Sequence, residues 1–261
     1  MIIDIHTHAW PDKISQKARA SLESYYTVEC VGDPTVATLR SFMDQNHIDV
    51  SVICAVASRP EQVASINDWL FSVAGGRLKV FASLHPEYTR WEEELRRIKD
   101  KGNGIKFQPG FQSFFVDDEK VFPLYEAIEK LQIPVLFHSG DELAPQMVIR
   151  ATPRRLLNVR KRFPGLTIIA AHLGGFRQWD EVKSALLGTD IYLDTSATFG
   201  YLPDDDIKYI LEHHRRDRIL FGTDFPFVNQ KKDLDHLDKL GLENKQKEMI
   251  LSSNAREILH I

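Results

Sequence analysis

Cysteine is scarce in this sequence. The 261 residues contain two, Cys30 and Cys54, and no CxxC motif. Two such thiols provide neither a disulfide framework nor a cysteine-rich zinc site, which excludes the small disulfide-stapled and zinc-finger classes of protein. Cys54 lies in the apolar run VSVICAV, so we expect it to be a core residue. A reducing, cytoplasmic location is the expectation that follows.

Long apolar runs and a strong excess of one charge are also missing. No stretch approaches the roughly 20 apolar residues of a membrane helix, and the first residues lack the pattern of a signal peptide. The net charge of −4 provides no electrostatic attraction for nucleic acid or an anionic membrane. No Ser/Gly-rich linker interrupts the chain. We therefore expect one domain over residues 1–261, with neither nucleic acid nor membrane as a partner.

The sequence does contain a repeated alternation of short, β-rich apolar segments with amphipathic helices. Stretches such as WEEELRRIKDKG and VFPLYEAIEKLQ have the helical period. Most segments start roughly 24 to 33 residues after the previous one, the length of one strand–helix unit. Eight units in a chain of this length predict a (β/α)8 TIM barrel rather than an open doubly wound sheet. The expected strands are 2–6, 50–56, 78–84, 104–107, 133–139, 166–172, 190–196 and 218–224.

Two parts of the chain exceed the eight-unit pattern. The interval between the first two segments is about twenty residues longer than the others, which predicts an inserted loop and helix at Ala9–Asp33 over the barrel mouth. After the eighth segment, DLDHLDKL and KQKEMILSSNAREIL have the pattern of extra helices that close the barrel. Both parts offer surfaces for a homodimer.

Five residues with metal-binding side chains follow or end the expected strands. His6 and His8 come from the first strand, His138 from the fifth, His172 from the sixth and Asp224 from the eighth. Side chains at i and i+2 of a strand share a face, so the two N-terminal histidines project together. Because the carboxyl ends of barrel strands meet at one mouth, we expect all five to converge there.

Three imidazoles and a carboxylate suit a divalent ion of the zinc type, with manganese as an alternative. An ion with an open position lowers the pKa of a bound water from 15.7 toward about 7, so that hydroxide is available at neutral pH. A structural zinc protein is the alternative from another class, namely a non-catalytic zinc-binding barrel. Structural zinc sites are usually closed and cysteine-rich, which this set of residues is not.

The motifs around these residues resemble those of a known family. DIHTH in the first strand, FHSG in the fifth, AAHLGG in the sixth and GTDFP in the eighth resemble the amidohydrolase superfamily. Within it they are most similar to the amidohydrolase-related branch, which contains aminocarboxymuconate-semialdehyde decarboxylase, resorcylate-type decarboxylases and metal-dependent hydrolases. The resemblance extends from Ile3 to the C-terminal SSNAREIL.

The resemblance implies a role for each of the five residues. His6, His8, His138 and Asp224 would ligate a single zinc-like ion. His172 would act as a base that orients or deprotonates the metal-bound water, and Asp224 would be both a ligand and a proton acceptor.

Lys106, in GIKFQP at the end of the fourth strand, has two possible roles by the same resemblance. In two-metal relatives, a lysine at this strand is carbamylated and bridges both ions. In single-metal relatives it faces the carboxylate of the substrate. A third interpretation is a rim lysine with a packed stem and a solvated ammonium. We expect one ion and a substrate-facing Lys106, with the carbamylated bridge to a second ion as the alternative.

The expected function is hydrolysis of a small organic substrate through an amide, lactone or ester-like bond by a metal-activated water. The alternative is non-oxidative decarboxylation of an aromatic or unsaturated carboxylic acid, because the same ligands serve both reactions. Trp10, Gln108 and Phe111 are expected on the mouth loops, where they would contact the substrate. Packing of the loops is the competing explanation for such aromatic residues.

Overall fold

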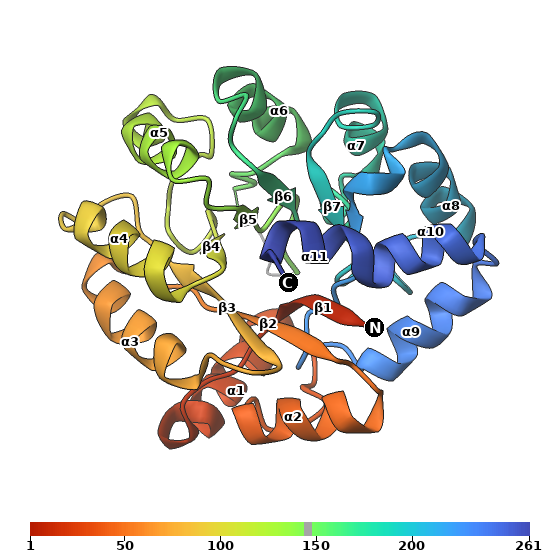
Figure 1. Cartoon of the computed structure of the whole chain (residues 1–261), viewed down its shortest axis with the longest axis horizontal. Coiled ribbons are helices and arrows are strands. Elements are labelled where there is room, and N and C mark those ends of the chain that lie inside the picture. Colours follow the sequence, from red (N-terminus) through yellow and green to blue (C-terminus); the bar gives the residue numbers. More distant parts are fainter. Residues whose placement is uncertain (144–147) are drawn as a thin grey trace.

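The computed structural model describes residues 1–143 and 148–261, and its centre is a parallel eight-stranded sheet in the chain order β1 to β8 (Figure 1). All eight expected strands are present, each within about four residues of the expected bounds. The strands are β1 (Ile3–Thr7), β2 (Val50–Cys54), β3 (Leu78–Ser83), β4 (Gly104–Phe107), β5 (Val135–Phe137), β6 (Ile168–Ala170), β7 (Tyr192–Asp194) and β8 (Ile219–Leu220).

The sheet closes because β1 also bonds to the chain at and beyond β8. The Ile5 amide donates to the carbonyl of Phe221 at 2.9 Å, and the Asp224 amide donates to the carbonyl of His6 at 2.8 Å. A parallel bridge joins Thr7 to Phe225. The prediction of a single-domain (β/α)8 barrel is therefore confirmed.

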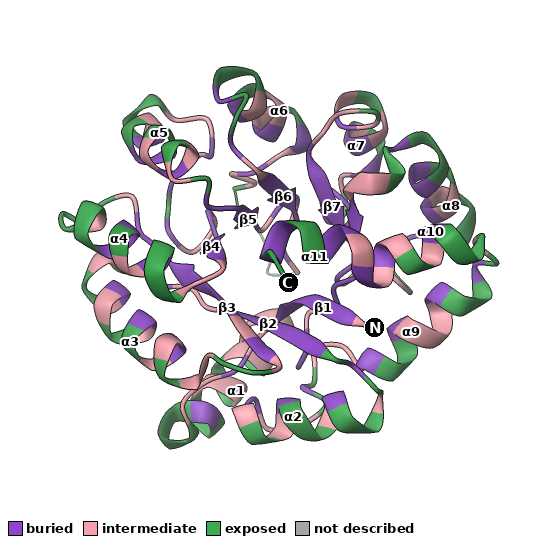
Figure 2. Cartoon of the chain, in the orientation of Figure 1, coloured by how far each residue is buried: buried purple, intermediate pink, exposed green. Residues whose placement is uncertain are grey.

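Helices alternate with the strands and bury one face each, as Figure 2 shows. In α4, for example, Leu95 and Ile98 are buried, while glutamates occupy the first turn and lysines the last, which favours the helix dipole at both ends. The helices are α1 (Asp12–Tyr26), α2 (Val36–Gln45), α3 (Val63–Val73), α4 (Trp91–Lys101), α5 (Phe122–Lys130), α6 (Pro153–Arg162), α7 (Trp179–Ala185), α8 (Asp204–His213), α9 (Gln230–Lys239), α10 (Asn244–Glu248) and α11 (Asn254–Leu259). None of those described is long and apolar enough to cross a bilayer.

Both predicted additions to the barrel are present. Helix α1 fills most of the Ala9–Asp33 insertion, and α2 is the regular helix between β1 and β2. At the C-terminus, α10 runs through a π-helical turn at Met249–Ser253 into α11, which lies across one end of the barrel in Figure 1. Ile258 and Leu259 of α11 pack with interior residues such as Ile3, and so close the amino end of the barrel.

Strand β1 contains one residue more than β2 opposite it. Asp4 pairs with Ser51 but Thr7 pairs with Ile53, so the register shifts within β1. A bulge of this kind re-aims the side chains around it. As a result, Asp4 accepts hydrogen bonds from Thr223 and from Gln230 of α9, whereas His6, two residues later, faces the interior.

Two glycines allow neighbouring groups to approach closely in the interior of the barrel. A Cβ at Gly104 would lie 2.6 Å from the ring of Phe81, so only glycine leaves room for that ring. Gly222 has the same role at the mouth, where a Cβ would lie 3.0 Å from the Cβ of His6. The strand that leads to Asp224 can therefore approach β1 closely.

Candidate active site

Three of the predicted ligands form a compact cluster at the mouth. Nε2 of His8 lies 3.0 Å from Oδ1 of Asp224, and Nε2 of His6 lies 3.5 Å from the same oxygen. One ligand atom from each residue lies within 4.8 Å of the others. The bulged end of β1 and the turn after β8 thus bring two imidazoles and a carboxylate to one point.

The hydrogen bonds of these two histidines fix which nitrogen is free. Nδ1 of His6 donates to Oδ2 of Asp194 at 3.0 Å, and Nδ1 of His8 donates to the carbonyl of Cys54 at 2.8 Å. Because a carbonyl and an ionised carboxylate only accept, both imidazoles carry the proton on Nδ1. Each Nε2 therefore presents a lone pair toward Asp224.

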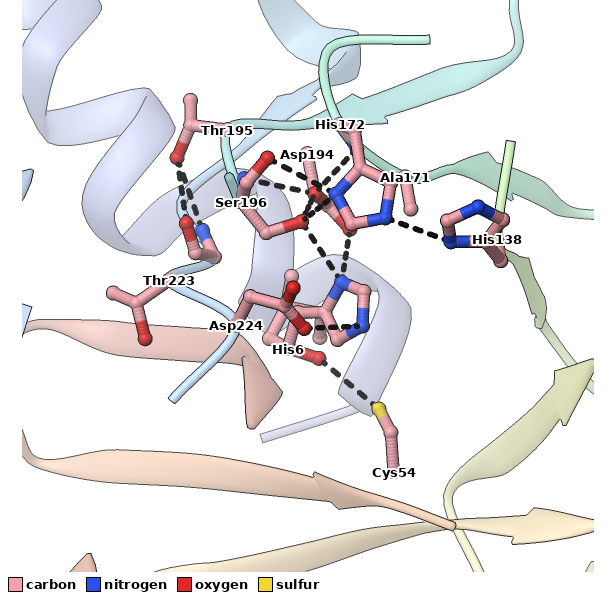
Figure 3. Close-up of polar contacts among 12 residues, drawn as sticks. His6, Cys54, His138, Ala171, His172, Asp194, Thr195, Ser196, Thr223 and Asp224 are labelled. Atoms are coloured by element: carbon pink, nitrogen blue, oxygen red, sulfur yellow. Dashed lines mark hydrogen bonds and ion pairs between the residues drawn. The ribbon is translucent and has the colours of Figure 1, made fainter. Parts of the chain in front are cut away.

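His138 and His172, which follow β5 and β6, are also each anchored by one ring nitrogen (Figure 3). Nδ1 of His172 faces the carbonyl of Ser196 at 3.1 Å, and Nε2 of His138 faces the carbonyl of Asp141 at 3.1 Å. The other nitrogens, Nε2 of His172 and Nδ1 of His138, lie 3.0 Å apart, so two lone pairs point at each other. A shared proton or a cation is needed to make this contact favourable.

This donor set fits a divalent cation. Four imidazoles are anchored by one ring nitrogen and direct the other inward beside a carboxylate, and nitrogen and oxygen donors of this kind suit zinc and manganese. His172 is close to the compact cluster, since a nitrogen of its ring lies within 4.8 Å of His6 and Asp194. His138 reaches the cluster through His172. The assignment of His138 as a ligand and of His172 as a base stays a prediction.

The surroundings of His6 and Asp224 favour the protonation states that bind metal. Burial, and after it the charge of Lys106, lowers the pKa of His6 to about 4. Burial raises the pKa of Asp224, but the adjacent imidazoles of His8 and His6 outweigh it and hold the pKa below its usual value. A neutral imidazole and an ionised carboxylate are the states that coordinate cations.

Two further residues of the cluster, Asp194 and Ser196 at and just after the end of β7, are not among the predicted site residues. Asp194 bonds to His6 with one oxygen and accepts from the amide of His172 with the other, at 3.1 Å. The Ser196 hydroxyl donates to Asp194 and lies 3.0 Å from Nδ1 of His172. A carboxylate behind a ligating histidine fixes its tautomer and raises its basicity. Their position at a strand end was the available signal.

The backbone is strained at two of the functional positions. His172 has a φ of 60° and Asp224 a φ of 66°, in the left-handed region that non-glycine residues seldom occupy. Each such residue costs on the order of 1 kcal/mol, which the surrounding contacts must offset. The strand ends are therefore bent so that both side chains point into the mouth.

Lys106 lies in the barrel interior and not at a solvated rim. Its side chain is 2% exposed, and Nζ lies 2.9 Å from Nε2 of His6. Burial lowers the pKa of Lys106, and no carboxylate of the described residues forms an ion pair with it. The rim interpretation is therefore wrong, because β4 directs the side chain inward.

A cavity of about 660 Å³ opens above the cluster. His8, Lys106 and Asp224 line its floor, and the three predicted substrate contacts, Trp10, Gln108 and Phe111, all line its walls. The Phe111 ring also packs against Tyr25, with 5.3 Å between centroids, so loop packing and cavity lining coexist there.

One wall of the cavity carries a polar network that the sequence did not reveal. Nε2 of Gln108 donates to Glu142 at 3.1 Å, and the Tyr26 hydroxyl from α1 lies 3.5 Å from the other carboxylate oxygen. Burial raises the pKa of Glu142 to about 7, although the hydrogen bonds from Gln108 and Tyr26 lower it. Tyr26 of the insertion and Glu142 of the loop after β5 are 116 residues apart in the sequence and meet at this wall.

Comparison with known proteins places this geometry in context. A family model described as Amidohydrolase matches residues 3–261. The Decarboxylase orsB of Emericella nidulans is 25% identical over 122 residues, which cover 38% of this chain and 36% of that protein. The chain therefore matches about a third of the length of this curated relative.

Two solved structures show the same fold at low identity. The 2,6-dihydroxybenzoate decarboxylase from Rhizobium is 18% identical, with a TM-score of 0.72 over 99% of this chain and 98% of that chain. The 5-carboxyvanillate decarboxylase from Novosphingobium aromaticivorans, complexed with manganese and a nitrobenzoic acid, is 15% identical, with a TM-score of 0.75 over 100% and 96%.

Proposed function

Because this chain is a metal-dependent enzyme of the amidohydrolase family, we propose that it decarboxylates an aromatic or unsaturated carboxylic acid. Decarboxylases among the similar proteins favour this reaction over hydrolysis of an amide, lactone or ester-like bond. Membership in an enzyme family disfavours the non-catalytic zinc-binding barrel. The proposed substrate is a small molecule held in the cavity above His8, Lys106 and Asp224.

The observation that carries the proposal is the burial of Lys106, whose amino group lies beside the ligand cluster. A buried cation without a carboxylate partner is costly, and a bound carboxylate removes that cost. Lys106 lines the cavity from β4, next to His6. It would therefore bind the carboxylate of the acid, which places the carbon that bears this group near Asp224.

The metal would be held by His6, His8, His138 and Asp224. It would polarise the carboxylate or a neighbouring hydroxyl of the substrate as a Lewis acid. Manganese in a structural relative makes it a candidate beside zinc. Asp194 and the Cys54 carbonyl hold the two histidines of β1 in the ligating tautomer.

Asp224 is the proposed proton donor. Asp224 rests as a carboxylate, would accept a proton by way of His172 once the substrate is bound, and would pass it to the carbon that bears the substrate carboxylate. The bond between that carbon and the carboxylate then breaks, its electron pair restores the unsaturated system, and carbon dioxide leaves. His172, next to the cluster, would return a proton to Asp224 from solvent for the next turnover.

The test is release of carbon dioxide from a panel of hydroxybenzoic and unsaturated acids by protein loaded with manganese or zinc. We expect turnover of at least one acid, and Asp224→Asn should reduce kcat about 10²- to 10⁴-fold. Asp205→Asn, the same change on the exposed face of α8, is the matched control and should retain full activity. Turnover of lactones or amides with no release of carbon dioxide would establish the hydrolase instead.

The number of ions is measured on the same preparation by inductively coupled plasma mass spectrometry. We expect about one ion per chain, with Lys106 as a free amine. Two ions per chain, together with a carbamate adduct in the intact mass, would assign Lys106 to a metal bridge.

A further inference from the structure

The cavity above the ligand cluster of His6, His8 and Asp224 is larger than the proposed reaction requires. Its volume is about 660 Å³, in the middle of the range of about 300 to 1,000 Å³ found for drug-sized ligands. An acid with a single ring fills only part of such a space. Two helices, α1 and α3, line part of the remainder.

Helix α1 directs an apolar stripe into this space. Ile14, Ala18 and Leu22 recur every four residues, so they lie on one face of the helix, and all three line the cavity. Ser15 is the buried residue of α1, and Ile14 remains 42% exposed. The apolar face of the insertion thus borders a cavity where an ordinary barrel helix would pack against strands.

Helix α3 provides the facing wall. Ile66 and Trp69 line the cavity from one side of the helix, with Ser65 at its edge. The adjoining face of α3 buries Val63 and Leu70 in the core. Two helices therefore expose apolar side chains to the same space, which is continuous with the site at Lys106 and Asp224.

We propose that the substrate carries an apolar substituent, an alkyl or acyl chain of several carbons on its ring, which lies between α1 and α3. This inference rests on the proposed function, because it places the carboxylate at Lys106. The occupant is the distal part of the substrate, since the apolar space and the polar floor form one cavity. Contact with Ile14, Leu22 and Trp69 removes apolar surface from water, which strengthens binding with each methylene.

The probe is a series of 6-alkyl-2-hydroxybenzoic acids from methyl to heptyl, together with unreactive alkyl-nitrophenols in which a nitro group replaces the carboxylate. Calorimetry on the manganese-loaded protein gives Kd for the nitro series. We expect about two- to fourfold tighter binding for each added methylene up to about five carbons. Values of kcat/KM for the acids should rise in the same order.

Substitutions on the two walls test the location. Ala18→Phe fills the space from α1 and should abolish the chain-length dependence, while the methyl compound binds within about twofold of the native protein. Ala20→Phe, the same change on the exposed face of α1, should retain the dependence. Ser65→Phe provides an independent block from α3, at an exposed position that does not contribute to the core.

The outcomes separate this inference from the proposed function. Equal affinity for all chain lengths, or an unchanged dependence in Ala18→Phe and Ser65→Phe, overturns the apolar substituent even if short acids lose carbon dioxide. A chain-length dependence in the nitro series that both blocks abolish supports it even if no acid is decarboxylated. No binding of any member also counts against it.

Discussion

Both ends of the barrel interior hold buried side chains, but the chemistry of the two ends is opposite. At the amino end, Ile3 packs with Ile258 of α11 in a wholly apolar cluster. At the carboxyl end, the same strands bury His6, Lys106 and Asp194, each at most 2% exposed. Burial stabilises the fold at the amino end. At the carboxyl end, part of that stabilisation is lost because ionisable groups are buried there.

The carboxyl end also holds two residues of the site in a strained backbone conformation. The left-handed residues His172 and Asp224 lie at the carboxyl end, within a network of hydrogen bonds. The amino end relies mainly on contact between apolar side chains. Substitutions at the amino end should therefore alter the free energy of unfolding, and substitutions at the carboxyl end should alter metal binding and activity.

The largest effect on stability is expected at the amino end, for Ile258→Ala. Truncation leaves a cavity under the barrel, which should lower the free energy of unfolding by about 2 to 4 kcal/mol. Urea denaturation measures this loss, and kcat/KM of the remaining folded protein should stay within about twofold. Glu257→Ala, the exposed neighbour on α11, should change stability by less than about 0.5 kcal/mol. A parallel loss of activity in Ile258→Ala would remove the distinction between the two ends.

The carboxyl end is probed by Asp194→Asn. The amide keeps the shape of the carboxylate but loses the charge that holds Nδ1 of His6, so metal affinity should fall about 10- to 100-fold. Competition with a chromogenic chelator measures the affinity, and Asp205→Asn is the exposed control. Unchanged metal affinity would show that the bond between Asp194 and His6 serves packing alone.

The sequence was sufficient for the features that repeat. Eight apolar segments at even spacing define the strands, and the strand-end rule brings His6, His8 and Asp224 together. The sequence did not predict contacts that depend on how strands pair or on how loops fold over the mouth. The bulge in β1 arises from pairing with β2, and Glu142 meets Tyr26 only because α1 folds over the mouth.

Asp194 illustrates the same limit. It ends β7 as His172 follows β6, but a lone carboxylate in DIYLDTS carries no spacing signal of its own. Its role follows from a distance of 3.0 Å to a residue 188 positions away. Composition and periodicity report the side of a strand on which a residue lies, and not the partner that it meets there.

The smallest expected effect concerns a buried carboxylate outside the barrel, between the two ends. Asp233 of α9 is 3% exposed, and its Oδ2 has no hydrogen-bond partner among the described residues. Burial, and after it the charges of Asp4 and Asp224, raises the pKa of Asp233 to about 9. The folded state therefore binds this proton more tightly than the unfolded state, whose pKa is near the ordinary 3.8.

The sign of the pH dependence follows from that order. The stability that protonated Asp233 contributes is complete below about pH 4 and is lost as the pH rises toward 9. Asp233→Asn cannot ionise, so the variant should be more stable than the native protein by at least about 1 kcal/mol at pH 8.5 and match it near pH 4. Urea denaturation at the two pH values measures the difference. Asp238→Asn, on the exposed face of α9, should change stability by less than about 0.5 kcal/mol at both. If the difference in stability between the variant and the native protein is the same at both pH values, solvent or a cation must reach Asp233. The helices would then not seal this side chain from water.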